Sequence, residues 1–407
     1  MTKTAFVSRW SLLLLAILLS GCSWFGKKTG NEPMELEKFE STAKLQKAWS
    51  RGVGNGQGPG FTSLVPAIDG DNIYAVDYQG KLAVFNATSG KKVFTTKVNQ
   101  PELSLWQSIK GLWSEGDSRY HLTGGVFAGH GLILVASQLG EVIALDQTNG
   151  KELWRAAVTG EVLAPPQSNG EIVVAQTING KIFAFDAKTG KRRWFYENAA
   201  PNLTLRGTPA PVVSDTAVYA GFSNGRVIAF NSSNGVILWE QRIALPKGRS
   251  ELERMVDIHA SPVLQGGILY VASYQGRAMG LARGTGSIIW GQDASTAKNI
   301  AVDGSALYLS DANGAVIALN AANGTELWRN EQLLRRQLSA PQVIGDYVAV
   351  SDYKGYLHLL SQADGSFAAR TKLGGKGARA PMLWHENKLY VFNNKGKLIA
   401  YRLADKK

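Results

Sequence analysis

The chain has few of the side chains that carry acid–base, metal or nucleophilic chemistry. No two of its histidines stand at the HxH or HExxH spacing that brings two imidazoles onto one metal ion. We expect neither a phosphate-binding loop nor the strand–turn–helix elbow that presents a nucleophilic serine. The sequence therefore predicts no enzyme activity, no catalytic residue, no metal site and no bound cofactor. The five histidines are His121, His130, His259, His358 and His385.

The single cysteine, Cys22, directly follows a segment typical of secretion signals. Two basic residues precede an apolar run over 12–19 that is too short to be a comfortable transmembrane helix. The ending Leu19-Ser20-Gly21-Cys22 resembles the bacterial lipobox, whose cysteine is diacylated on sulfur and becomes the new N-terminus. An ordinary signal with an incidental cysteine is the alternative. We predict a signal peptide over 1–21 and lipidation at Cys22.

A lipidated Cys22 implies a location for the protein. Several acyl chains on one residue anchor stably, whereas a single chain binds a membrane only marginally. In Gram-negative lipoproteins an aspartate after the cysteine favours retention at the inner membrane, and this chain has Ser23 there. We expect an outer-membrane protein that faces the periplasm. The segment 22–44 is interpreted as a lipidated tether, with a short helix near 36–47.

Two segments carry side chains that suit protein docking. In Asn202-Leu203-Thr204-Leu205-Arg206-Gly207 the two leucines alternate, so in an extended chain both project from one face, beside Arg206. Apolar anchors next to a polar one are typical of binding hot spots. The alternative is that both leucines cap the core at the edge of a repeat, which would make them structural. The second segment runs from Leu245 to Asp257.

A repeat of about 40 residues organises the rest of the chain. One copy reads GEVIALDQTNGKELW from Gly140 to Trp154, a short apolar strand, a tight turn and a second strand. Seven copies place a second glycine ten residues after the first, and an eighth copy begins at Gly396. A further strand pair precedes each hairpin. Four-stranded units at this spacing are the signature of a β-propeller.

The eighth copy ends before its aromatic residue, and the N-terminus supplies a replacement. Lys47-Ala48-Trp49-Ser50 resembles the KELW ending of the complete copies. We predict that the strand around Trp49 pairs with residues 396–402 and closes the ring without an open edge. The fold is therefore expected to be all-β, an eight-bladed propeller of four-stranded antiparallel blades over 45–407, closed by an N-terminal strand.

Two interruptions of the repeat mark loops, which in repeat proteins often form the binding face. The first separates Gly80 from Gly140 and contains Trp106 and Trp113. The second separates Gly225 from Gly276. The formal net charge is +12, so anionic partners such as lipid headgroups and acidic protein faces are favoured. Nucleic acid is a poor candidate for an exported protein.

The repeat Ala184-Phe185-Asp186-Ala187-Lys188-Thr189-Gly190 with Trp194 resembles the propeller repeat of pyrroloquinoline-quinone (PQQ) dehydrogenases. That resemblance implies an alternative function, a periplasmic quinoprotein. Those enzymes are longer and place a cysteine pair and a calcium site beside the cofactor. This chain has one cysteine, which lipidation would use.

The whole chain resembles the BamB family, lipoproteins of the outer-membrane β-barrel assembly (Bam) machine. The resemblance covers the lipobox, the closing strand, eight repeats and both loops, including NLTLRG over 202–207 and LPKGRSELERMVDI over 245–258. It implies a non-enzymatic subunit that aids folding and insertion of outer-membrane proteins. A lipoprotein scaffold for another envelope complex is the remaining alternative.

The BamB resemblance also implies partners and contact residues. The partners are the periplasmic domains of the central barrel-assembly subunit, the other Bam lipoproteins and nascent outer-membrane strands held by edge pairing. Leu203, Leu205 and Arg206 would bind the central subunit, together with an acidic pair whose first member is Asp257. The second acidic position is His259 here, a departure from the family pattern that puts the charge pairing in doubt.

Overall fold

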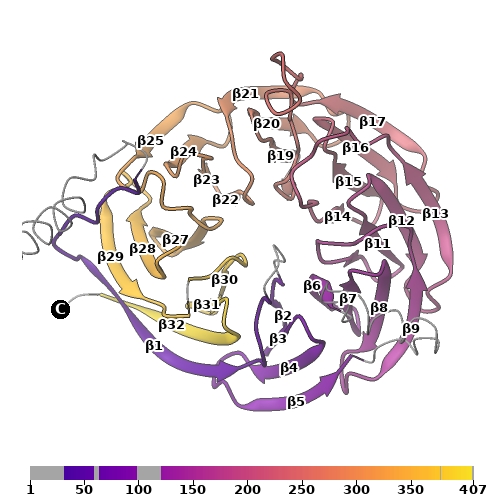
Figure 1. Cartoon of the computed structure of the whole chain (residues 1–407), viewed down its shortest axis with the longest axis horizontal. Helices are drawn as coiled ribbons and strands as arrows, with labels where there is room; N and C mark the ends of the chain where they lie inside the picture. The colour runs from indigo at the N-terminus through magenta and orange to yellow at the C-terminus, as the bar shows by residue number, and fades with distance from the viewer. Residues whose placement is uncertain (1–31, 59–63, 99–120, 376, 406–407) are drawn as a thin grey trace, which may run out of the picture.

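The fold is a closed ring of eight four-stranded antiparallel sheets, an eight-bladed β-propeller (Figure 1). The computed structural model describes residues 32–58, 64–98, 121–375 and 377–405. The predicted signal peptide, Cys22 and the Trp106–Trp113 insertion lie outside these residues. In the described part of the chain every regular element is a strand, and no helix there is long and apolar enough to cross a membrane. The predicted fold class is confirmed.

Each blade is a meander whose first strand lies nearest the axis and whose fourth strand forms the rim (Figure 1). Blade 1 comprises β2 (Ala67–Asp69), β3 (Asn72–Val76), β4 (Lys81–Asn86) and β5 (Lys92–Lys97). Blade 2 comprises β6 (Leu122–Gly129), β7 (Leu132–Ser137), β8 (Glu141–Asp146) and β9 (Glu152–Ala157). Blade 3 comprises β10 (Gln167–Ser168), β11 (Ile172–Gln176), β12 (Lys181–Asp186) and β13 (Arg192–Glu197). Blade 4 comprises β14 (Val212–Val213), β15 (Ala217–Gly221), β16 (Arg226–Asn231) and β17 (Ile237–Arg242).

The second half of the ring repeats this order. Blade 5 comprises β18 (Val263–Gln265), β19 (Ile268–Ala272), β20 (Gly276–Ala282) and β21 (Ile288–Ala294). Blade 6 comprises β22 (Ala301–Asp303), β23 (Ala306–Ser310), β24 (Val316–Asn320) and β25 (Glu326–Asn330). Blade 7 comprises β26 (Gln342–Ile344), β27 (Tyr347–Ser351), β28 (Tyr356–Ser361) and β29 (Phe367–Lys372). Blade 8 comprises β30 (Leu383–His385), β31 (Lys388–Phe392), β32 (Lys397–Asp405) and, as its rim strand, β1 (Ala43–Gly52).

The apolar runs of the repeat form the two middle strands of each blade. In β7 and β11, for example, every residue is buried, because both faces of a blade pack against neighbouring blades. Strands covered on both faces are expected to read as continuous apolar runs rather than as alternating ones. The core is therefore a series of apolar layers between blades, arranged around the axis.

The repeat tryptophans join each blade to the next. Six indole Nε1–H groups donate to a carbonyl in the strand 3–4 turn of the following blade, at 2.7 to 3.0 Å. The second repeat glycine of that turn lies against the indole ring at a φ near +70°, and a side chain there would overlap the ring. This contact explains why a glycine and a tryptophan recur together at six of the eight blade junctions. The six pairs are Trp49–Ala87, Trp154–Ala187, Trp194–Ser232, Trp239–Arg283, Trp290–Ala321 and Trp328–Gln362.

The N-terminal strand closes the ring as predicted. β1 pairs antiparallel with β32, from Ala43 opposite Asp405 to Gly52 opposite Lys397. Trp49 is 7% exposed and donates to Ala87 of blade 1, so the first strand of the chain joins the last blade to the first. The two ends of the propeller sequence are thus held together by hydrogen bonds and by ring packing.

The expected helix near 36–47 is wrong. Residues 33–42 are irregular and β1 begins at Ala43, because the unpaired edge of β32 offers this segment a full ladder of hydrogen bonds. Part of the expected tether also lies against blade 7. Its carbonyls at Glu32, Met34 and Glu37 accept hydrogen bonds from Arg335, Arg336 and Arg370, and Phe39 stacks on Phe367.

His358 belongs to a buried network in blade 7 beneath this segment. Its Nδ1 accepts from Arg370 Nε at 3.1 Å, so Nε2 carries the proton and donates to Asp352 Oδ2 at 3.3 Å. Arg336 also donates to Asp352, at 2.6 and 2.8 Å. Burial lowers the pKa of His358, so it packs as a neutral ring. This histidine is structural.

Candidate functional site

The predicted docking residues lie at one end of the propeller. Because the strands of a blade alternate in direction, the segment that enters a blade and its strand 2–3 turn share one end of the ring. The entry segment of blade 4 contains Leu203, Leu205 and Arg206, and that of blade 5 contains Asp257 and His259. Blades 4 and 5 are neighbours, so the two segments meet (Figure 1).

A hydrogen bond joins the two segments directly. The backbone N–H of Leu205 donates to Asp257 Oδ1 at 3.1 Å, across 52 residues of sequence. A third entry segment, that of blade 3, is tied in by Glu161, whose two carboxylate oxygens accept from Arg206 Nη2 at 2.9 and 2.8 Å. The Arg206 side chain is half exposed, and an exposed ion pair of this kind contributes at most about 1 kcal/mol. Its main effect is to orient the guanidinium.

The leucines differ in exposure. Leu203 is 41% exposed. Leu205 is partly buried and lines the axial cavity, a hollow of about 470 Å³ between the entry segments of the blades. The segment is therefore not a simple cap on the core, because one of its two leucines projects into solvent. We define the docking surface as Leu203, Leu205 and Arg206, with the supporting residues Asp257 and His259.

Asp257 supports this surface from below. It is 3% exposed, and burial raises its pKa to about 6, although the N–H of Leu205 opposes that shift. Its second oxygen, Oδ2, lines a cavity of about 10 Å³ together with Gln176 Oε1 and Thr208 Oγ1. None of these three oxygens has a hydrogen-bond partner among the described residues. Asp257 therefore holds the blade 4 segment in place and offers no exposed charge.

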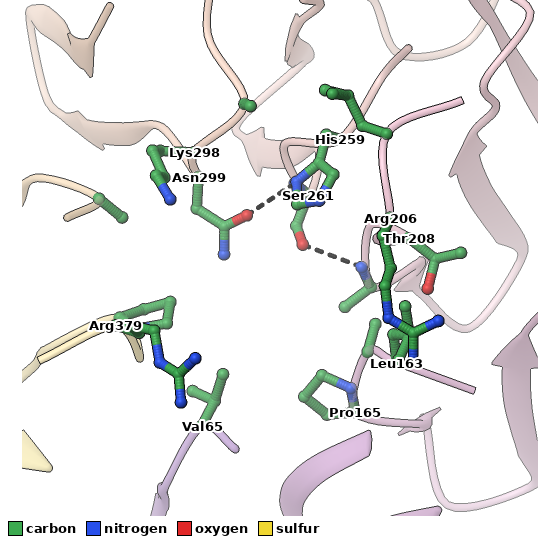
Figure 2. A pocket seen from close by; sticks show the side chains of 16 residues that line it. Val65, Leu163, Pro165, Arg206, Thr208, His259, Ser261, Lys298, Asn299 and Arg379 are labelled. Carbon is green, nitrogen blue, oxygen red and sulfur yellow. Dashed lines mark hydrogen bonds between the residues drawn. The ribbon is translucent and has the colours of Figure 1, made fainter. Parts of the chain in front are cut away.

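His259 packs against the other end of the same segment. Its ring lies over Gly207, and a methyl group at Gly207 would overlap the imidazole. Burial lowers the pKa of His259, and the positive charge of Lys298 acts in the same direction. His259 is thus neutral at physiological pH. The ring also lines the axial cavity, on the same side as Arg206 (Figure 2).

The site offers no evident group for catalysis. Over the ranges that the structure describes, no three His, Cys, Asp or Glu side chains gather closely enough to hold a metal ion. The five residues Gly221-Phe222-Ser223-Asn224-Gly225 have the letters of the G-x-S-x-G motif, contrary to the expectation that the sequence contains none. They form the turn between β15 and β16, and the next element is a strand, so Ser223 does not sit on a nucleophile elbow.

Sequence reasoning found the two segments but not what supports them. It missed Glu161, the partner of Arg206, and Gly207, the platform for His259. It also missed Lys298 and Arg379, which line the same cavity as His259. No motif identifies Glu161, Lys298 or Arg379, and Gly207 was singled out only as the last residue of the 202–207 segment. Only their position in the entry segments, one per blade, would have drawn attention to them.

Asp257→Asn should raise stability at neutral pH. A carboxyl whose pKa rises from 3.8 to about 6 on folding favours the folded state most below pH 3.8, and this contribution is lost as the pH rises through 6. This difference between the folded and unfolded pKa corresponds to about 3 kcal/mol. That figure is the upper bound on how much the free energy of unfolding rises when the charge is removed. Asparagine keeps an acceptor for the Leu205 N–H and adds a donor to the small cavity.

Denaturant unfolding at pH 7.5 and pH 4.5 measures this effect. We expect Asp257→Asn to unfold at higher denaturant than the parent at pH 7.5, with the difference shrinking at pH 4.5. Asp215→Asn, which removes an exposed carboxylate from the turn before β15, is the matched control and should change little. A less stable Asp257→Asn variant with the parent's pH dependence would show that the ionised carboxylate is well compensated.

Comparison with known proteins shows extended similarity to one family. The family model described as outer membrane protein assembly factor BamB matches residues 104–330 and 312–407. The BamB of Pseudomonas aeruginosa is 41% identical over 393 residues, which is 97% of this chain and 98% of that protein. The BamB of Escherichia coli K12 is 32% identical over 93% of this chain and 94% of its own length.

Solved structures show the same fold. The crystal structure of BamB from Moraxella catarrhalis superposes with a TM-score of 0.76 at 25% identity, covering 88% of this chain and all of that one. A quinohemoprotein alcohol dehydrogenase from Comamonas testosteroni superposes with a TM-score of 0.65 at 14% identity, covering 88% of this chain and 76% of that one. At that identity the likeness to the dehydrogenase concerns the fold alone.

Proposed function

The chain belongs to the BamB family of outer-membrane protein assembly factors, and from this premise we propose that it is a non-enzymatic subunit of the Bam complex. Its docking surface binds periplasmic domains of the central barrel-assembly subunit. Through that contact it aids the folding and insertion of outer-membrane proteins. The observation that carries the proposal is the exposed Leu203 beside Arg206, on a segment tied to both neighbouring blades.

The geometry suits docking because the surface is organised before a partner arrives. Immobilising a loop on binding costs free energy, and a loop that is already ordered avoids part of that cost. Here Asp257, Glu161 and His259 hold the segment from three directions. Leu203 and Leu205 supply apolar contact and Arg206 orients the partner. Asp257 and His259 contribute by positioning the blade 4 segment.

A quinoprotein function has little support in the axial cavity. Calcium is held by carboxylate and carbonyl oxygens. Among the residues that the structure describes, none of the side chains that line the axial cavity is acidic. The chain also has a single cysteine, so a cysteine pair cannot form within it. These features favour an adaptor that works by binding rather than a dehydrogenase.

Co-purification from detergent-solubilised outer membranes tests the proposal. We expect the full-length tagged protein to retain the integral barrel-assembly subunit and the other Bam lipoproteins at moderate salt. A tagged unrelated outer-membrane lipoprotein is the control for carry-over in micelles. Retention of a different envelope complex instead, or of none, would contradict the proposed role.

We propose that the protein is anchored in the outer membrane through acyl chains on Cys22 and faces the periplasm. Cys22→Ala removes the thiol that would be acylated, so incorporation of a palmitate analogue should fall to background in metabolic labelling. Ser23→Asp is the matched variant, because it keeps the thiol. It should label normally but shift to the inner-membrane fraction. Labelling of Cys22→Ala equal to the parent would exclude Cys22 as the acceptor.

A further inference from the structure

A groove of about 600 Å³ lies between the rims of blades 4 and 5, which are neighbours in the ring (Figure 1). Its walls come from the end of β17, from the residues 243–247 that follow it, and from β20 and β21. β17 ends and β20 begins at the end of the ring that carries the docking surface, so the groove opens at that end. We call it the rim groove and define it by the lining residues Arg242, Leu245, Lys247 and Ile288.

The rim groove exposes apolar side chains that the fold does not require. Leu245 is 59% exposed and Ile288 is 50% exposed, above a floor that includes the buried side chains of Ile243 and Met279. Ile288 stands two residues before the repeat aromatic, and four other copies carry a charged residue at this position. They are Lys92, Glu152, Arg192 and Glu326. Since a charged residue is compatible with the blade, the apolar one suits an interaction, as exposed apolar patches commonly do.

The uncompensated charge of the rim groove is positive. Arg277 Nε lies 3.2 Å from Asp293 Oδ1, so these two lining residues neutralise each other. Arg242 and Lys247 are exposed, and neither makes an ion pair with any residue that the structure describes. Two cations beside apolar walls favour an occupant that carries a carboxylate next to an apolar side chain.

One continuous segment, 243–258, joins the rim groove to the docking surface. It lines the groove at its start, and near its end Asp257 accepts the N–H of Leu205. Glu253 fixes the turn between these ends, because its carboxylate accepts two backbone N–H groups at 2.7 and 3.1 Å. A loop that is already ordered avoids part of the free-energy cost of binding. A partner that covers the docking surface therefore meets the groove through an ordered connection.

We propose that the rim groove is a second contact for the partner that binds the docking surface. An extended segment of the partner's periplasmic domains places an apolar side chain between Leu245 and Ile288 and a neighbouring carboxylate at Arg242 and Lys247. The volume admits a few side chains of one segment rather than a folded domain. The identity of the partner rests on the proposed function, whereas the chemistry of the groove follows from its own residues.

Ile288→Glu tests the apolar contact with residues that the fold accepts. The full-length variant is titrated in detergent with the purified integral barrel-assembly subunit. We expect about tenfold weaker binding, because an apolar contact is lost and a like charge faces the partner's carboxylate. The melting temperature should match the parent's, since Glu152 and Glu326 occupy this position in blades 2 and 6. Leu327→Glu is the matched control, because Leu327 is 51% exposed on β25 and lies outside the groove.

The outcomes separate this inference from the proposed function. Parent-like affinity of Ile288→Glu, when the parent itself binds the subunit, would overturn the rim groove and leave the proposed function intact. A parent protein that does not bind the subunit would contradict the proposed function and, with it, the assignment of the groove to this partner.

Lys247→Glu tests the carboxylate contact by its kinetics. A charge at the edge of an interface acts mainly on the association rate and on its salt dependence. We expect association with the subunit to slow several-fold at low salt, and the difference from the parent to shrink as salt is raised. Lys188→Glu is the control, since this exposed lysine lies in the strand 3–4 turn of blade 3, at the other end of the ring. An association rate equal to the parent's at low salt would overturn the carboxylate contact.

Discussion

Trp49→Ala should lower the free energy of unfolding by about 3–5 kcal/mol, the usual cost of truncating a buried tryptophan. The indole is 7% exposed and packs against Phe85 and Tyr390, from blades 1 and 8. Its Nε1–H donates to the Ala87 carbonyl at 2.9 Å, and that carbonyl would lose this partner. Because β1 is joined to β32 by hydrogen bonds rather than by a turn of the chain, the lost contact with Tyr390 also weakens ring closure.

Trp154→Ala separates the cost of losing a buried indole from the cost of weakening ring closure. Trp154 makes the same contact between blades 2 and 3, with its Nε1–H 2.9 Å from the Ala187 carbonyl, but its strand β9 is joined to β8 of the same blade by a turn of the chain. We expect a similar loss of stability in chemical denaturation. Only the Trp49 variant should also show faster amide hydrogen exchange along β1 and β32. A Trp49→Ala protein that unfolds like the parent would contradict the closing-strand account.

Leu205→Ala combined with Arg206→Ala should reduce affinity for the central barrel-assembly subunit at least thirtyfold. Truncating an anchor of a binding hot spot costs about 2 kcal/mol or more, which corresponds to that factor. Leu205 lines the axial cavity, and Arg206 is held in place by Glu161. The double variant removes an apolar contact and the orienting charge together. Co-purification from solubilised outer membranes, followed by titration with the partner's periplasmic domains, measures the loss.

The alternative reading of these residues predicts a different result. If Leu205 served only to cap the core, the double variant would be destabilised, so its melting temperature must be compared with that of the parent first. Leu238→Ala is the matched control, because Leu238 is 51% exposed on the rim strand β17, away from the entry segments. It should bind the partner normally. A stable double variant that also binds normally would remove the docking surface from the mechanism.

The sequence by itself determined the blades and their number. A short apolar run and a second glycine at a positive φ recur in all seven complete copies, and a tryptophan stands fourteen residues after the first glycine in five of them. The last copy lacks its aromatic residue, and this indicated the closing strand, because Trp49 stands in a segment that resembles the KELW ending and belongs to no other copy. The loop segments at 202–207 and 245–258 could also be found, because they interrupt a regular spacing.

Only the tertiary structure decided the state of the residues in those loops. Local preference predicted a helix near 36–47, but the open edge of β32 outweighs it by offering nine residues of pairing. Asp257 has the sequence signature of an exposed contact, yet the Leu205 N–H and its 3% exposure make it a buried support. Lys298 and Arg379 are unremarkable in sequence and 81 residues apart. They line one cavity only because the ring brings the entry segments of its blades to one axis. Contacts between residues this far apart in the chain produce no local sequence pattern.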